Sequence, residues 1–186
     1  LFTHLVEFNT VFWRASFFTS LLLFRFYCHL ISLNLRWVGG NFGFFVLQLT
    51  DWLVLPLRRL LPSIKKFDTS TWIGAFLCQF VYLSVKFFIL GASFHLVGVS
   101  VAAFFELLSA CISFLTGLIF ISILMSWIST NDQIKYLMEL LVEPLLRPLR
   151  AFIPLVAGID LSPLVFLLLL QIANIVLQGI YRQIMI

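Results

Sequence analysis

Four long apolar segments alternate along the chain with two segments in which charged residues and prolines interrupt the apolar pattern. The long segments cover about residues 13–36, 70–92, 101–128 and 162–184. Each is about as long as the roughly 20 residues that an α-helix needs to cross the hydrocarbon core of a bilayer. The pattern therefore predicts four transmembrane helices.

The two interrupted segments cover residues 42–61 and 132–153. In the second, charged residues share one broad face of a helix and leucines oppose them: Asp132, Lys135, Glu139, Glu143 and Arg150 against Leu137, Leu140 and Leu141. This pattern is typical of an amphipathic helix that lies in the membrane interface. Two further true spans are the alternative, which the placement of the charges disfavours.

Composition narrows the class of protein. Of the 186 residues, 62% are hydrophobic and 11% are charged, whereas a soluble domain is about 25% charged. Soluble, disordered and disulfide-scaffold proteins are excluded, and we expect an all-α integral membrane protein. Cys28, Cys78 and Cys111 all fall in apolar runs, so we interpret them as core residues and expect neither a disulfide nor a metal site.

Three arginines divide the first apolar segment into equal intervals of eleven residues: Arg14, Arg25 and Arg36. The outer two are about 33 Å apart in a helix, so both can reach an interface and leave Arg25 near the midplane. We expect Gly39 and Gly40 to end this helix. No acidic residue is expected at the depth of Arg25 on another span, so a partner subunit, a lipid phosphate or water is expected to pair it.

The chain carries an internal duplication at an offset of 92 residues. The matching pairs are Asp51 and Glu143, Pro56 and Pro148, Arg58 and Arg150, Pro62 and Pro154, Asp68 and Asp160, Ser70 and Ser162, and Gln79 and Gln171. We predict two parallel repeats, residues 1–97 and 98–186, each with a span, an interfacial helix and a second span. The prolines are expected to limit the helices, and Ser162 is expected to be an N-cap beside Asp160.

The cations predict the orientation. Eight lie on the side of the interfacial segments: Arg36, Arg58, Arg59, Lys65, Lys66, Lys135, Arg147 and Arg150. Only Arg14 and Arg182 lie near the other side, so we expect a multi-pass protein of the bacterial inner membrane with both termini on the outer, periplasmic side. The cluster of Arg58, Arg59, Lys65 and Lys66 binds anionic lipid headgroups or only signals topology, and both interpretations stay open. We do not expect direct binding of nucleic acid.

Several stretches resemble one known family. TDWLVLPLRRLLP (50–62), EPLLRPLR (143–150), GIDLSPLVFLLLLQ (158–171) and LLLFRFY (21–27) resemble the YggT (YlmG) family of small membrane proteins. Ala151 departs from the second arginine that is usual there. The resemblance implies the duplicated architecture. It also implies a link to osmotic tolerance in bacteria and, in plastids, to the assembly of membrane complexes and to nucleoid organisation, but no reaction.

Polar residues recur on single faces of the predicted spans. They are Arg25, His29 and Ser32; Gln79, Tyr82 and Lys86; Glu106; and Gln171, Asn174 and Gln178. Such residues face other helices or a cavity rather than lipid. They are either contacts between helices, with Lys86 and Glu106 neutralising each other, or the lining of a path for an ion or solute.

No motif of a hydrolase, a metalloprotease or a phosphate-binding enzyme is present in the sequence. We therefore expect neither an enzyme nor a cofactor. The leading hypothesis is a non-catalytic assembly factor or auxiliary subunit of a larger membrane protein complex, in contact with other integral membrane subunits. The alternative is an ion or small-solute channel or permease linked to osmotic stress.

Overall fold

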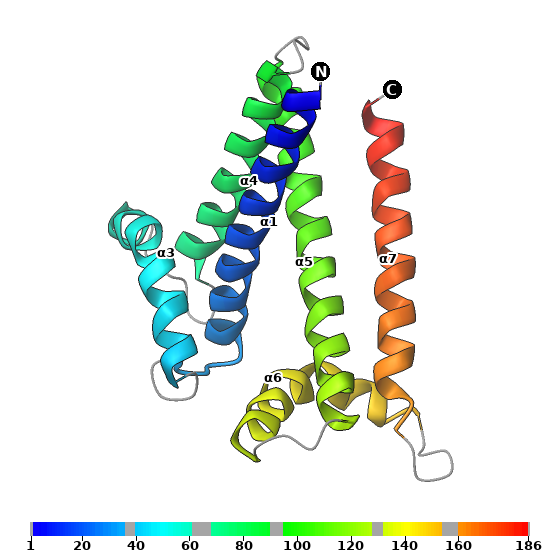
Figure 1. Ribbon diagram of the computed structural model, residues 1–186. Coiled ribbons are helices and arrows are strands. Elements are labelled where there is room, and N and C mark those ends of the chain that lie inside the picture. The colour runs from blue at the N-terminus through cyan, green and yellow to red at the C-terminus, as the bar shows by residue number, and fades with distance from the viewer. Residues whose placement is uncertain are drawn as a thin grey trace. The chain divides into compact units, whose positions relative to one another are not determined.

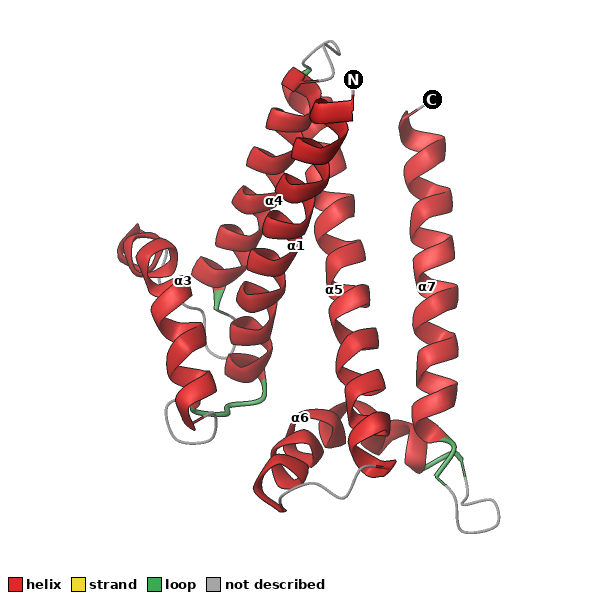
Figure 2. Ribbon diagram, viewed as in Figure 1, coloured by secondary structure: helices red, strands yellow, loops and turns green. Residues whose placement is uncertain are grey.

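The computed structural model describes residues 2–35, 40–60, 68–89, 95–127, 132–153 and 160–185, and within these ranges it contains helices and no strand (Figures 1 and 2). The helices are α1 (Phe2–Leu30), α3 (Gly40–Leu60), α4 (Thr69–Ile89), α5 (Leu96–Trp127), α6 (Asp132–Arg150) and α7 (Ser162–Met185). The predicted all-helical class is confirmed.

Three of the described helices are long and apolar enough to cross a membrane: α4, α5 and α7. Three such helices are typical of a membrane protein, which is the class that the composition predicts. Helix α1 is not among the three, because Arg14, Arg25 and His29 lower the mean hydropathy of its apolar stretch.

Helix α1 differs from the predicted first span at both ends, since it begins at Phe2 and ends at Leu30. The expectation that Gly39 and Gly40 end it is wrong. The Leu33 N–H donates to the Cys28 carbonyl at 2.8 Å and the Ser32 N–H to the His29 carbonyl at 3.0 Å, which is the Schellman pattern that closes a helix. Ser32 takes the left-handed conformation usually given to glycine, with φ 60°, at a cost of about 1 kcal/mol.

The prolines do not end the interrupted helices where we expected. Pro56 lies inside α3, which continues to Leu60, and Pro148 lies inside α6, which continues to Arg150. A proline removes one hydrogen-bond donor and kinks a helix more readily than it stops one when flanking turns hold. Figure 1 shows α3 changing direction toward its C-terminal end.

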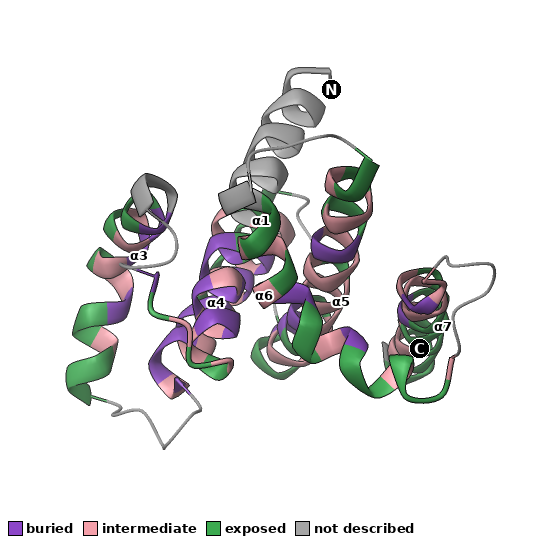
Figure 3. Ribbon diagram, turned by 90° about the horizontal axis from the view of Figure 1, so that it is seen from below, coloured by how far each residue is buried: buried purple, intermediate pink, exposed green. Residues whose placement is uncertain are grey.

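The chain forms two compact units, Leu1–Cys111 with Gln178–Ile186, and Ile112–Leu177. The first unit is built on α4, which carries much of the buried surface in Figure 3. The rings of Phe26 in α1 and Trp72 in α4 lie 5.2 Å apart. At the other end of α4, Tyr82 and Leu83 pack with Val99, Ala102 and Ala103 of α5.

The second unit buries apolar residues of α5, α6 and α7: Leu118, Ile119, Leu141, Val142, Leu146 and Leu170. In α6, Leu141 and Leu146 are buried while Glu139, Glu143 and Arg147 are exposed. The repeat boundary expected at residue 97 stays a prediction.

Candidate functional site: a charged pocket at the end of α1

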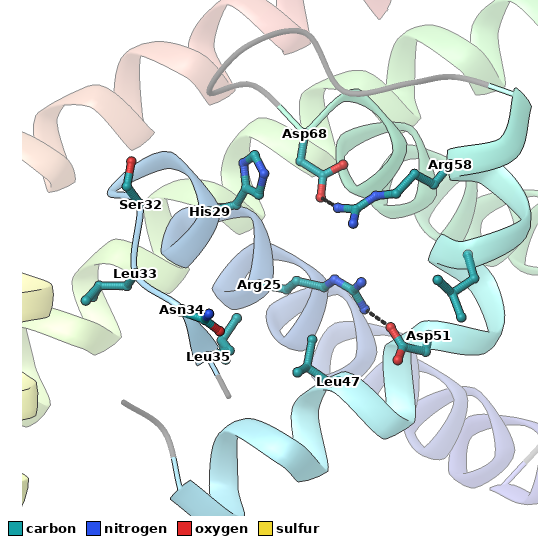
Figure 4. Close-up of a pocket in the computed structure, with 11 residues that line it drawn as sticks. Arg25, His29, Ser32, Leu33, Asn34, Leu35, Leu47, Asp51, Arg58 and Asp68 are labelled. Carbon is teal, nitrogen blue, oxygen red and sulfur yellow. Dashed lines mark hydrogen bonds and ion pairs between the residues drawn. The ribbon is translucent and has the colours of Figure 1, made fainter. Parts of the chain in front are cut away.

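A pocket of about 680 Å³ opens in the first unit where α1 ends beside α3 and the start of α4 (Figure 4). Its lining combines charged, polar and apolar residues: Arg25, His29, Ser32, Leu33, Asn34, Leu35, Leu47, Asp51, Leu55, Arg58 and Asp68. Two of the residues predicted to share a polar face with Arg25, namely His29 and Ser32, therefore do lie with it.

Arg25 is paired within the chain. Its Nη1 donates to Asp51 Oδ1 at 2.7 Å and to Thr50 Oγ1 at 2.7 Å. We expected a partner subunit, a lipid phosphate or water to pair Arg25, because no acidic residue was expected at its depth on another span, but the structure pairs it with a carboxylate of this chain. The carboxylate comes from α3, which we predicted to lie in the interface, and α3 packs against α1 at the level of Arg25. Sequence reasoning missed Thr50, although it directly precedes Asp51 in the motif.

The two partners of this ion pair differ in exposure. The Arg25 side chain is 7% exposed and that of Asp51 34%. A buried guanidinium is costly unless it is paired and hydrogen-bonded, and Asp51 and Thr50 supply this for Arg25.

A second ion pair lies beside the first. Arg58 Nη2 donates to Asp68 Oδ2 at 2.5 Å, and Thr71 Oγ1 donates to the same oxygen at 2.8 Å. The Asp68 carbonyl accepts the Trp72 N–H at 3.1 Å, so Asp68 is the N-cap of α4. Its other carboxylate oxygen, Oδ1, is buried and accepts no hydrogen bond from the described residues.

The corresponding residues of the second unit are more exposed. Arg150 Nε donates to Asp160 Oδ2 at 2.8 Å, and Arg150 also pairs with Glu143. The side chains of Arg150, Glu143 and Asp160 are 44%, 51% and 29% exposed. Burial tends to raise the pKa of Asp160, but hydrogen bonds from Ser162 and the Arg150 guanidinium outweigh it and lower that pKa below its ordinary value.

The start of α7 differs by one residue from the prediction. The Leu161 carbonyl accepts the Val165 N–H at 3.1 Å, so Leu161 is the N-cap and Ser162 the first helical residue. Asp160 Oδ1 accepts the Ser162 N–H at 2.9 Å. The carboxylate, rather than the Ser162 hydroxyl, therefore satisfies a free amide at this helix end.

The predicted polar faces of the other spans separate into buried and exposed groups. Gln79 Nε2 donates to Thr19 Oγ1 of α1 at 3.3 Å, whereas Gln171 and Gln178 of α7 are exposed and Asn174 is half-buried. Glu106 lies close enough to Tyr82 and Tyr181 to act on their hydroxyls electrostatically. The neutralisation of Lys86 by Glu106 stays a prediction.

Part of the predicted motif cannot be placed. Arg36, Pro62, Lys65, Lys66 and Pro154 lie outside the described residues. Of the predicted lipid-binding cluster the structure therefore describes Arg58 and Arg59, both exposed at the end of α3, and it buries Ser70 at the start of α4. Among the residues that the structure describes, no three His, Cys, Asp or Glu side chains gather as a metal site requires.

Comparison with known proteins gives one family. The sequence model of the CCB3/YggT family matches residues 8–89 and again residues 101–181. No solved structure matches the chain. The "Uncharacterized protein YggT" of Escherichia coli (strain K12) is 29% identical over 150 residues, 78% of this chain and 78% of its own. The "Uncharacterized protein in proC 3'region" of Vibrio alginolyticus is 34% identical over 145 residues, 75% of this chain and 77% of its own.

Neither of these names states an activity. The matches extend over the motifs that surround the pocket and over the three apolar helices, which fit a protein of the bacterial membrane. The chain belongs to the CCB3/YggT family.

Proposed function

We propose that this chain acts as a non-catalytic assembly factor or auxiliary subunit of a larger membrane protein complex. The observation that supports this role is the exposed amide of Gln171 on the apolar helix α7. Only 6% of the most apolar stretch of α7 is buried. Neighbouring Leu168 and Ile172 suit lipid tails, but an amide in hydrocarbon needs a hydrogen-bond partner.

Gln79 shows what such an amide needs. It lies 92 residues before Gln171, it is 6% exposed, and it donates to Thr19 of α1. The residue 92 positions after Thr19 is Cys111, whose sulfur is a weak hydrogen-bond acceptor. A polar contact between membrane helices is worth on the order of 1 kcal/mol. We infer that a helix of another membrane protein supplies this contact to Gln171.

The proposal includes a topology. Helix α1 is a fourth span, α3 and α6 lie in the interface, and both termini face the periplasmic side of the inner membrane. The excess of cations beside the interfacial segments supports the orientation, and the buried leucines of α6 opposite its exposed charges support an interfacial helix. The two segments matched by the family model support two parallel repeats. Anionic lipids meet the cluster of Arg58, Arg59, Lys65 and Lys66.

Affinity purification from native membranes in a mild detergent tests the proposed role. The tagged chain is compared with Gln171→Leu, which removes the amide, and Gln171→Asn, which keeps one. We expect a membrane protein to co-purify with the parent chain and with Gln171→Asn. Its yield is expected to fall about fivefold with Gln171→Leu, the loss that one such hydrogen bond predicts.

A parent chain that elutes alone as a monomer contradicts this role. Reconstitution into liposomes adds a second check, because a channel would use the same polar face of α7. Flux of an ion or solute above that of empty vesicles, abolished by Gln171→Leu, would show that the amides serve permeation and that the proposal is wrong.

A further inference from the structure

We propose that the pocket at the end of α1 binds a phosphoethanolamine group, as the headgroup of a zwitterionic phospholipid. The first argument is the buried guanidinium of Arg25. Its Nη1 donates to Asp51 and Thr50, and Arg25 lines the pocket together with a second arginine, Arg58. Phosphate oxygens are the ligands that a planar guanidinium binds best.

The charge balance of the lining indicates a ligand of both signs. The pocket holds two cations, Arg25 and Arg58, and two carboxylates, Asp51 and Asp68. A purely anionic headgroup would compete with both carboxylates for the guanidinium groups and would leave the site with excess negative charge. A zwitterion adds one charge of each sign and keeps the balance.

The cationic end of the ligand has a place beside Asp51. Oδ1 of this carboxylate accepts a hydrogen bond from Arg25, and the side chain is 34% exposed. The C-terminal end of α1 reaches the same pocket through Ser32 and Leu33, and the carbonyl end of a helix favours a cation. A primary ammonium donates hydrogen bonds to such acceptors, whereas the quaternary ammonium of a phosphocholine group cannot.

The apolar part of the lining suits a lipid more than a free solute. Four leucines line the pocket beside the charged residues, namely Leu33, Leu35, Leu47 and Leu55, and Figure 4 shows the first three of them. They give the glycerol and the first methylene groups of an acyl chain a surface on which to pack. In Figure 4 the guanidinium of Arg25 points toward Asp51 and that of Arg58 toward Asp68.

Native mass spectrometry of the purified chain tests the inference. The protein is mixed with equimolar phosphatidylethanolamine, phosphatidylcholine and phosphatidylglycerol of identical acyl chains. We expect the ethanolamine lipid to be retained at least about fivefold over both others, the effect of about one hydrogen bond. Soluble phosphoethanolamine is added in a separate arm. Displacement of the lipid by it shows that the headgroup suffices, and failure to displace shows that the lipid body contributes as well.

Three variants locate the site. Leu55→Trp adds bulk to the pocket lining and leaves the four charged residues of both ion pairs in the sequence, and it is expected to lower retention about tenfold. Asp51→Asn is expected to abolish the preference for ethanolamine over choline. Arg25→Lys keeps the charge but removes the planar donors, and retention is expected to fall about tenfold. Arg150→Lys is the matched control in the second unit and is expected to retain lipid as the parent chain does.

Circular dichroism tests whether each variant is folded. If the variants of charged residues do not fold, Leu55→Trp alone tests whether lipid binds in the pocket. The preference is read from the retention that Leu55→Trp removes, because phosphatidylglycerol retained in that variant is bound at the cluster of Arg58, Arg59, Lys65 and Lys66. Equal or greater loss of phosphatidylglycerol than of phosphatidylethanolamine in Leu55→Trp overturns the inference. Unchanged retention of phosphatidylethanolamine in Leu55→Trp overturns it as well, because that lipid would then bind elsewhere.

Discussion

The two halves of the chain carry the same arginine–aspartate pair in different surroundings. Arg58 pairs with Asp68 in the first unit and Arg150 with Asp160 in the second, in each case ten residues apart. Asp68 is 1% exposed and lines a pocket, whereas Asp160 is 29% exposed. In both halves this pair connects the end of one helix to the start of the next. The two pairs differ in the burial of the aspartate.

The difference follows from what the neighbouring apolar helix supplies. Asp51 meets Arg25 of α1, while its counterpart Glu143 pairs with Arg150 of its own helix. The residue 92 positions after Arg25 is Gly117. A short ion-pair motif can thus fold in both halves, but it becomes a buried charged site only where an apolar helix carries the complementary charge.

The most severe test of this comparison removes, in each half, the arginine that pairs with the first acidic residue of the motif, Asp51 or Glu143. Arg25→Met leaves Asp51 without its cation in a largely buried site, which is expected to lower the free energy of unfolding by about 3 kcal/mol. Arg150→Met breaks exposed pairs and is expected to cost less than about 1 kcal/mol. Unfolding in mixed micelles, followed by circular dichroism, measures both. Equal losses would show that the burial of Arg25 has no energetic consequence.

Much of the fold could be predicted because membrane helices follow from local hydropathy. The predicted spans 70–92 and 162–184 differ by at most three residues at either end from α4 and α7. The end of α1 could not be predicted in the same way. Ser32 adopts a left-handed conformation that sequence reasoning assigns to glycine, and hydrogen bonds to the preceding turn hold it there.

The candidate site was predicted only in part. The helical spacing of Arg25, His29 and Ser32 placed them on one face, and the pocket contains all three. The pairing of Arg25 with Asp51 depends on how α3 packs against α1. The spacing of residues within each helix gives no information about this packing. Assigning Asp51 to the interface and Arg25 to the midplane separated two residues that the fold brings together.

A glycine at the packing of α3 provides the second test. A Cβ added to Gly43 would lie 2.1 Å from the carbonyl oxygen of Leu35, a backbone atom. Gly43→Ala is therefore expected to displace the start of α3 from the segment that follows α1 and to cost about 2 kcal/mol. Gly117, at the position equivalent to Arg25, has nothing within 4 Å of its added Cβ.

Gly117→Ala is the control, and we expect it to stabilise α5 by up to about 1 kcal/mol through helix propensity. The same micelle unfolding assay compares the two variants. Destabilisation by Gly117→Ala equal to that by Gly43→Ala would mean that the second half is packed as closely at this position as the first half is at Gly43.

The smallest effect is expected from the pH dependence of the exposed pair. The folded state holds the pKa of Asp160 below its ordinary value of 3.8, so its contribution to stability is present above about pH 4 and is lost as the pH falls through the folded pKa. Because the pair is partly exposed, this contribution is expected to stay below about 1 kcal/mol. The difference in melting temperature between the parent chain and Asp160→Asn should therefore shrink between pH 6 and about pH 3. A difference that grows on acidification would mean that the carboxylate is stabilised in its protonated form, which the hydrogen bonds from Arg150 and Ser162 oppose.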